Sequence, residues 1–300
     1  MSLTAEQRVN RAKGFGGTDA APALGVSKRK STLQLYLEKR GEIEPDWEET
    51  EDSRWGRLLE PVVRQWYAEK TKRIVRLPEK TIFHEKYTWM MAHPDGISEP
   101  AKPALNVHDD TAVKGYEGKT ARFDEEWGDQ GTDEVPQDHL LQTQHYMIVL
   151  DLPVYDLAVL IGREFRLYEI PADRELQQMI IDAEHDLWQR VLKGEPPEPD
   201  FRRADASRII RKLYPGTDGQ IIAATQEQIA LRDQWIEQAS IEKTAKKSAE
   251  AYKAQLLYEM AEAAVLAFPD GKGLRRKEIN RVGYSVEPTT YIDARLVNHR

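Results

Sequence analysis

The chain has 300 residues, of which 40% are hydrophobic and 31% are charged, and its formal net charge is −8 at pH 7. This length predicts two domains, or one large domain with an appendage, and the composition excludes a disordered chain. The absence of cysteine excludes disulfides, thiolate zinc sites, iron–sulfur clusters and a cysteine nucleophile. No apolar run approaches the roughly 20 residues that cross a bilayer, and the first residues lack a signal-peptide core, so we expect a cytoplasmic protein with no membrane partner.

Charge is distributed unevenly along this acidic chain. Residues 42–52 hold seven acids and no base, whereas 201–217 and 272–281 each hold five bases and one acid. The net negative charge argues against a non-specific nucleic-acid coat. Basic stretches on an acidic chain fit an enzyme that gathers carboxylates around metal ions and grips a polyanion elsewhere, although scattered solvated charge is the ordinary interpretation.

Short helices are predicted near the beginning of the chain. After a Gly-Gly turn, Thr18 or Asp19 is placed to cap a brief alanine-rich helix. Ser31 then opens a second helix, which we expect to stop at Gly41.

A longer helix is predicted over 53–71. The apolar residues of its expected buried face are Trp55, Leu59, Val62 and Trp66. Pro61 falls within this pattern, so either it kinks the helix or the regular part begins near Leu59.

The middle of the chain alternates extended and helical segments. Extended segments are predicted at 80–84, 88–93, 112–120, 154–161 and 165–170, and helices at 136–150 and 173–194. Helices that alternate with strands around a short mixed sheet belong to the α/β (or α+β) class.

The EPPEPD stretch at 195–200 is a stiff linker, and it ends a first domain over 1–200. The remaining region, 201–300, begins with a basic linker. Residues 220–268 are almost entirely helix formers with apolar stripes, which predicts a long helical hairpin or coiled-coil appendage. One or two short terminal strands are expected over 281–296.

Three acidic residues and a lysine stand at positions that favour chemistry. Asp95 lies in a Pro-Asp-Gly turn after a strand-like run. In the next strand, Glu117 and Lys119 point to one face because side chains alternate, and the Gly118 carbonyl between them can still face a metal. Glu60 lies just beside the apolar stripe of its helix.

Together these groups could hydrolyse a phosphodiester. Carboxylate oxygens are hard ligands that suit Mg²⁺ or Mn²⁺. A metal held there would acidify a bound water, which Lys119 would orient or deprotonate. Taken alone, an E-x-K triplet is typical of a strand-edge salt pair, and Pro-Asp-Gly of an ordinary turn. Their order after a helical glutamate is much less common.

Four blocks in this order resemble the YqaJ-like viral recombinase group, the lambda-exonuclease-like members of the PD-(D/E)xK nuclease superfamily. The blocks are RAKGFGGTDAAPALG at 11–25, WGRLLEP at 55–61, PDG at 94–96 with EGK at 117–119, and PQDHLLQTQHYM at 136–147. The resemblance covers about two thirds of the chain, from residue 10 to 195, and implies a PD-(D/E)xK nuclease core there.

The resemblance implies a catalytic and metal-binding group. Asp95, Glu117 and Glu60 would hold Mg²⁺, for which Mn²⁺ would substitute, together with the Gly118 carbonyl. Lys119 would serve the attacking water.

The resemblance also implies contacts to a substrate phosphate. These would come from Arg11, Thr18 and Gln142, and from His93, which stands where the group has a serine. The forked guanidinium group of Arg11 and the neutral hydrogen-bond donors of Thr18 and Gln142 suit a phosphate. Thr18 as a helix cap, and Gln142 as a solvated helix residue, remain open as alternatives.

The implied function is a Mg²⁺-dependent DNA nuclease of phage recombination, foremost a 5′→3′ exonuclease on linear double-stranded DNA that leaves 3′ single-stranded overhangs. A homo-oligomer, with a trimeric ring favoured, would compensate for the negative charge by enclosing DNA. A single-strand annealing protein is the expected partner, in the cytoplasm of a bacterial host of a phage or prophage.

Two other functions stay open: a DNA endonuclease of the same fold, and a DNA-end-binding or scaffold protein with a vestigial nuclease site. A zinc site at His139 and His145 is disfavoured, because neither cysteine nor a close third ligand accompanies them.

Overall fold

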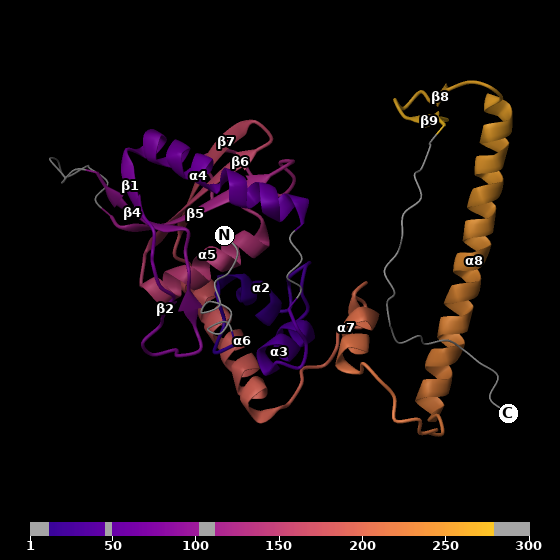
Figure 1. Ribbon diagram of the computed structural model, residues 1–300, viewed down its shortest axis with the longest axis horizontal. Coiled ribbons are helices and arrows are strands. Elements are labelled where there is room, and N and C mark those ends of the chain that lie inside the picture. Colours follow the sequence, from indigo (N-terminus) through magenta and orange to yellow (C-terminus); the bar gives the residue numbers. More distant parts are fainter. Residues whose placement is uncertain (1–11, 46–49, 102–111, 279–300) are drawn as a thin grey trace. The chain divides into compact units, whose positions relative to one another are not determined.

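The computed structural model describes residues 12–45, 50–101 and 112–278. The chain divides into two compact units, Met1–Tyr214 and Pro215–Arg300 (Figure 1). Within the described part of the chain, no helix is both long and apolar enough to cross a membrane.

The first unit is built on a five-stranded mixed sheet in the order β1-β4-β5-β6-β7. Its strands are β1 Arg73–Arg76, β4 Gly96–Pro100, β5 Lys114–Ala121, β6 Val154–Ile161 and β7 Glu164–Pro171. Strands β5 and β6 run parallel, and the other neighbours pair antiparallel. A separate two-stranded ribbon joins β2 Ile82–Phe83 to β3 Met91–Ala92. The predicted α/β class with a short mixed sheet is thus confirmed.

Helices α4 Glu51–Thr71 and α5 Gln137–Leu150 cover opposite faces of this sheet (Figure 1). The other helices of the unit are the 3-10 helix η1 Gly17–Asp19, α2 Ala20–Ala23, α3 Thr32–Arg40, α6 Arg174–Lys193 and α7 Ala206–Leu213. Strand β6 shows the two sides. Leu157 and Val159 share a core with Met147 of α5, whereas Ala158 packs in another core with Val63 of α4.

Helix α4 turns a different face to the core than its sequence predicts. Val63 and Tyr67 are fully buried, whereas Trp55 and Val62, on the predicted buried stripe, are 56% and 47% exposed. Apolar residues stand in adjacent pairs along this helix, so their spacing fixes the period of the pattern but not its phase. Pro61 lies inside the regular helix.

Two helices begin and end at the predicted residues. The Ser31 hydroxyl caps α3 by accepting a 3.1 Å hydrogen bond from the Gln34 N–H, and Gly41 ends it at φ 69°. Asp173 caps α6 in the same way, and Gly194 ends it at φ 75°. Glycine suits both ends because it adopts the left-handed backbone without a steric cost.

Strands β1 and β4 have no counterpart in the sequence-based prediction. Conversely, the predicted extended segments 80–84 and 88–93 contain only the two-residue strands β2 and β3. Whether such short polar segments become strands depends on pairing with a neighbouring strand, and the β-propensity of their residues does not reveal that pairing.

The first unit continues past the predicted boundary at residue 200. Helix α7 buries Ile209 against Leu187 and Val191 of α6. The stretch assigned to a basic linker therefore contains a packed helix, and the unit ends at Tyr214.

The second unit differs from the predicted hairpin. One continuous helix, α8 Gln226–Met260, takes its place because no glycine or proline interrupts its 35 residues. The Thr225 hydroxyl caps its start. Strands β8 Val265–Ala267 and β9 Gly273–Arg275 then form a small ribbon. The strands expected over 281–296 lie outside the described residues.

Candidate active site

Strand pairing brings Asp95 next to Glu117, although the two are far apart in sequence. Strands β4 and β5 pair antiparallel with Gly96 opposite Tyr116. Asp95 directly precedes Gly96, and its Oδ2 accepts a 3.0 Å hydrogen bond from the N–H of Gly118. The Asp95 carboxylate is therefore held against the strand that carries Glu117.

Glu117, Lys119 and Gln142 form a hydrogen-bonded set, here called the Glu117 triangle, between β5 and α5. Lys119 Nζ donates to Glu117 Oε1 at 2.7 Å and to Gln142 Oε1 at 3.0 Å. Gln142 Nε2 donates to the same Glu117 oxygen at 2.7 Å. Glu117 and Lys119 share one face of β5, as the alternation of side chains requires.

Among the described residues, the second carboxylate oxygen of Glu117, Oε2, has no hydrogen-bond partner, although Glu117 is only 3% exposed. Buried polar atoms are nearly always satisfied, so this oxygen remains available to contact a bound group. Burial, and next the charge of Asp95, raise the pKa of Glu117 to about 7, against the opposing effect of Lys119. A carboxylate in this environment gains from a nearby cation.

These donors fit Mg²⁺ or Mn²⁺, because both ions prefer carboxylate oxygens and Mg²⁺ commonly takes one or two carboxylates while keeping several waters. Asp95 and the orphaned oxygen of Glu117 supply such a pair. Among the described residues, no three acidic or histidine side chains gather as a metal-binding cluster. The third expected carboxylate, Glu60, is thus not part of the same group.

Glu60 lies on α4, and its Oε1 is 3.5 Å from Arg64 Nη1. Residues three apart share a helix face, so Glu60 lies on the side of Val63. Val63 Cγ1 would be 3.7 Å from a Cβ placed on Gly118. Glu60 therefore covers the α4 side of the strand whose other side carries Glu117.

Lys119 stays protonated at neutral pH. Burial alone would lower the pKa of its ammonium group, but the carboxylates of Glu117 and Asp95 raise this pKa overall. A permanently charged ammonium can orient a water molecule and offset negative charge on a phosphate.

The residues assigned to substrate phosphate are brought together only in part. Thr18 is exposed inside η1, so it does not cap a helix. A Cβ on the preceding Gly17 would lie 3.0 Å from Gln142 Cγ, so this glycine permits a close approach of the loop to α5. Gln142 is buried in the triangle rather than solvated. His93 is partly buried directly after β3, and Arg11 lies outside the described residues.

Arg29 is a positively charged neighbour of the site that the sequence analysis missed. Burial, and next the charges of Lys119 and Arg29, lower the pKa of His139 to about 3, so both cations lie near this ring. Arg29 is itself exposed. The basic run at 28–30, which follows the GGTD block, is the sequence signal that could have revealed it.

Both ring nitrogens of His145 are engaged, which leaves none for zinc. Nδ1 pairs with Glu184 Oε1 at 2.8 Å, and Nε2 pairs with the Met91 carbonyl oxygen at 2.9 Å. The imidazole ties α5 to α6 and β3, so its role is structural.

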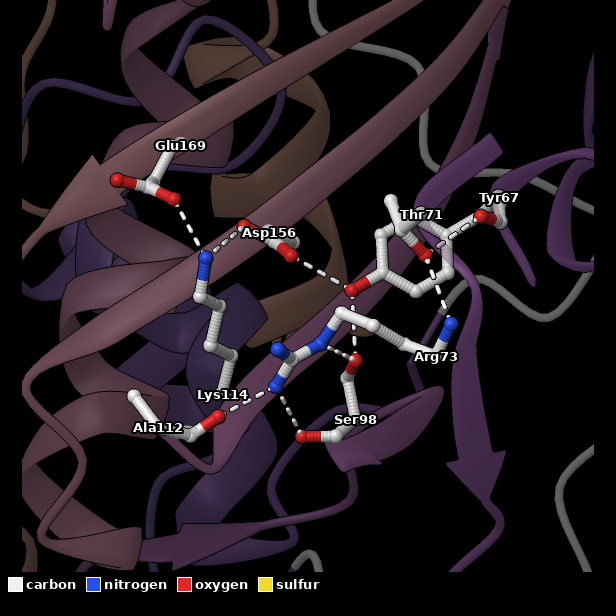
Figure 2. Close-up of polar contacts among 8 residues, drawn as sticks. All are labelled: Tyr67, Thr71, Arg73, Ser98, Ala112, Lys114, Asp156 and Glu169. Atoms are coloured by element: carbon white, nitrogen blue, oxygen red, sulfur yellow. Dashed lines mark hydrogen bonds and ion pairs between the residues drawn. The ribbon is translucent and has the colours of Figure 1, made fainter. Parts of the chain in front are cut away.

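A second polar cluster lies on the α4 side of the same sheet (Figure 2). The Tyr67 hydroxyl donates to Asp156 Oδ2 at 2.6 Å and shares a 2.6 Å hydrogen bond with Ser98 Oγ. Arg73 Nε donates to the same Ser98 Oγ at 2.7 Å, and Arg73 Nη2 donates to the Ser98 carbonyl at 2.9 Å. These contacts join α4 to β1, β4 and β6.

The same cluster, here called the Tyr67 cluster, continues to the edge of the sheet (Figure 2). Lys114 Nζ lies 2.5 Å from Glu169 Oε2 and 3.8 Å from Asp156 Oδ1. Its members are Tyr67, Arg73, Ser98, Lys114, Asp156 and Glu169. None of the buried side-chain atoms in this described group lacks a hydrogen-bond partner.

Known proteins are similar to this chain in sequence and in fold. Residues 8–152 match the model of the YqaJ-like viral recombinase domain. Over 233 residues the chain is 33% identical to the uncharacterised protein YqaJ of Bacillus subtilis (strain 168), covering 75% of this chain and 69% of that protein. The fold is similar to LHK-Exo, an alkaline exonuclease from Laribacter hongkongensis, with a TM-score of 0.50 and 18% identity over 69% of this chain and 100% of the other.

Proposed function

This chain belongs to the family of proteins with a YqaJ-like viral recombinase domain, and from that premise we propose that it is a divalent-metal-dependent DNA exonuclease. The observation that carries the proposal is the orphaned Oε2 of buried Glu117, next to Asp95 and within reach of the charged Lys119. The similarity in fold to LHK-Exo supports it. Mg²⁺ is the proposed cofactor, and Mn²⁺ its substitute.

Each residue of the site has its own role in the proposed reaction. Asp95 and Glu117 would hold the ion together with the Gly118 carbonyl, whereas Glu60, on the α4 side, is left out of this set. When bound, such an ion polarises the phosphodiester and acidifies a water molecule. Lys119 orients the attacking water and offsets the charge that develops on the phosphate. Gln142 fixes Oε1 of Glu117, which leaves the orphaned Oε2 for the ion.

The proposed substrate is linear double-stranded DNA, degraded from 5′ to 3′ to leave 3′ overhangs for a single-strand annealing protein. Thr18, Arg29, His93 and Arg11 would meet the phosphate groups. A homo-oligomer, proposed as a trimer, would enclose DNA and so compensate for the net charge of −8. The proposed setting is the cytoplasm of a bacterial host of a phage or prophage.

The first test compares 5′-phosphorylated linear duplex with a covalently closed circle, each with Mg²⁺ and with a chelator. We expect Mg²⁺-dependent shortening of the linear duplex and an intact circle. Equal cutting of both substrates would identify an endonuclease instead. A DNA-binding or scaffold protein would leave both substrates intact.

The second test is Lys119→Ala, which removes the ammonium from the site. We expect cleavage to fall by about a thousandfold, the size of effect seen when a single transition-state donor is removed, while DNA binding in a gel-shift assay persists. Lys193→Ala, at an exposed position of α6, is the matched control and should cleave normally. Unchanged cleavage by the Lys119→Ala protein would refute the assigned site.

A further inference from the structure

Tyr116 of β5 is fully buried, yet its hydroxyl has no hydrogen-bond partner in the part of the chain that the structure describes. A buried tyrosine hydroxyl normally finds a partner, because leaving it unsatisfied costs free energy. The neighbouring Tyr67 shows the ordinary case, since its hydroxyl bonds to both Asp156 and Ser98. The two rings pack together with centroids 4.7 Å apart. Only one of these two adjacent phenols is satisfied within the chain.

The hydroxyl of Tyr116 lies over Gly118. A Cβ placed on Gly118 would be 3.0 Å from this oxygen, so the absent side chain of residue 118 leaves the space that the phenol occupies. The N–H of Gly118 is the group that holds Asp95. The orphaned hydroxyl thus lies at the centre of the E-G-K strand segment, on its α4 side.

Charged groups surround this hydroxyl. Burial raises the pKa of Tyr116 well above its usual value, and Asp95, Glu117 and Glu60 raise it further, while Arg64 opposes them. The phenol is therefore a neutral hydrogen-bonding group, and it feels the charges of Asp95, Glu117 and Glu60. The other unsatisfied side-chain atom of β5, Glu117 Oε2, lies on the opposite face of the strand, and Asp95 is held at the Gly118 N–H of the strand itself.

We propose that Tyr116 is a positioning residue whose hydroxyl hydrogen-bonds a water molecule in the coordination shell of the divalent ion held by Asp95 and Glu117. This inference rests on the proposed function. Mg²⁺ releases its waters reluctantly, so a protein that binds it must satisfy them. Outer-shell hydrogen bonds of this kind typically change metal affinity by tenfold or more. A water molecule of the ion would supply the partner that the described residues do not give the hydroxyl.

The test is Tyr116→Phe, which deletes the one orphaned atom and keeps the ring. Mn²⁺ binding is measured by calorimetry, and stability by thermal melting without metal. We expect about a tenfold weaker Mn²⁺ affinity, and a metal-free melting temperature equal to or above that of the wild type, because the variant no longer buries an unsatisfied hydroxyl. Cleavage should need correspondingly more Mg²⁺ and approach the wild-type rate at saturation.

Tyr168→Phe is the matched control, because that ring is also buried but its hydroxyl donates to the Gly128 carbonyl at 2.7 Å. We expect the opposite pattern: a lower metal-free melting temperature and unchanged Mn²⁺ affinity. Equal Mn²⁺ affinity of Tyr116→Phe and wild type would overturn the proposal, as would a lower metal-free melting temperature of Tyr116→Phe. A wild-type chain that cleaves no DNA would refute the proposed function separately, since the Mn²⁺ comparison does not use cleavage.

Discussion

The Glu117 triangle and the Tyr67 cluster lie on opposite sides of β5, and both bury carboxylates beside cations. In the Tyr67 cluster every buried side-chain nitrogen and oxygen has a hydrogen-bond partner within the chain. For example, Arg73 donates to Ser98, and Tyr67 donates to Asp156. On the other side Glu117 Oε2 is left over. Because an unsatisfied buried group is costly, it persists where something else supplies the missing contact. The satisfied cluster therefore holds the fold, and the Glu117 triangle is the part that we propose binds an ion.

Asp156→Ala tests the structural side and should have the largest effect on folding. The change removes the acceptor of Tyr67 and a partner of buried Lys114, so we expect the free energy of unfolding to fall by about 3 kcal/mol. Urea denaturation measures it. The control is Glu169→Ala, whose side chain contacts the same Lys114 but is 63% exposed, so the loss should stay below about 1 kcal/mol. Equal losses for the two variants would contradict the assignment.

Gly118→Ala tests how closely the Tyr116 hydroxyl packs over Gly118 on the α4 side of β5. The new Cβ would lie 3.0 Å from the Tyr116 hydroxyl, and we expect a loss of about 2 kcal/mol in unfolding free energy from this overpacking. In the Tyr116→Phe background the hydroxyl is gone, so the loss should shrink in a double-mutant cycle.

A matched control for that change is Gly56→Ala on α4, where the nearest atom to the new Cβ is at an ordinary 3.6 Å. It should be neutral or stabilising, because alanine favours a helix over glycine. An additive cycle between positions 116 and 118 would show that the hydroxyl does not occupy the space over Gly118.

The pH dependence of metal binding should have the smallest effect. The folded pKa of Glu117, about 7, is above its ordinary value of 4.5, so the metal-free folded chain binds more protons than the unfolded chain between these values. Its stability therefore falls as pH rises through this window. Mn²⁺ binding requires the ionised carboxylate, so affinity measured by calorimetry should weaken towards tenfold per pH unit below 7.

Lys119→Ala tests whether Lys119 sets the pH at which Glu117 ionises. Lys119 lowers the pKa of Glu117, so without it the loss of Mn²⁺ affinity should begin at a higher pH. A midpoint that stays in place or moves to lower pH would show that Lys119 does not act on the ionisation of Glu117.

Local patterns predicted the parts of the site that depend on one element. Alternation along a strand put Glu117 and Lys119 on one face, and Gly41 and Gly194 marked helix ends. The phase of α4 was wrong because two adjacent apolar stripes compete, and only the sheet selects between them. The predicted hairpin at 220–268 was wrong because apolar stripes do not report a turn, and α8 has no residue that would make one.

The Tyr67 cluster and the orphaned Tyr116 hydroxyl were beyond sequence reasoning for a different reason. Tyr67 and Asp156 stand 89 positions apart and meet only because α4 covers β6. No spacing rule connects them. An unsatisfied hydroxyl becomes visible only when all of its neighbours are placed.

The antiparallel register of β4 and β5 has a consequence for how this family can diversify. Gly96 faces Tyr116, so ladder pairing sets the position of Asp95 relative to Glu117, independently of how many residues separate the two strands. The entropic cost of a longer connection grows only slowly with its length. We therefore expect relatives to gain or lose residues in the connection between β4 and β5 without moving Asp95 relative to Glu117. For the same reason, an epitope tag can be inserted there.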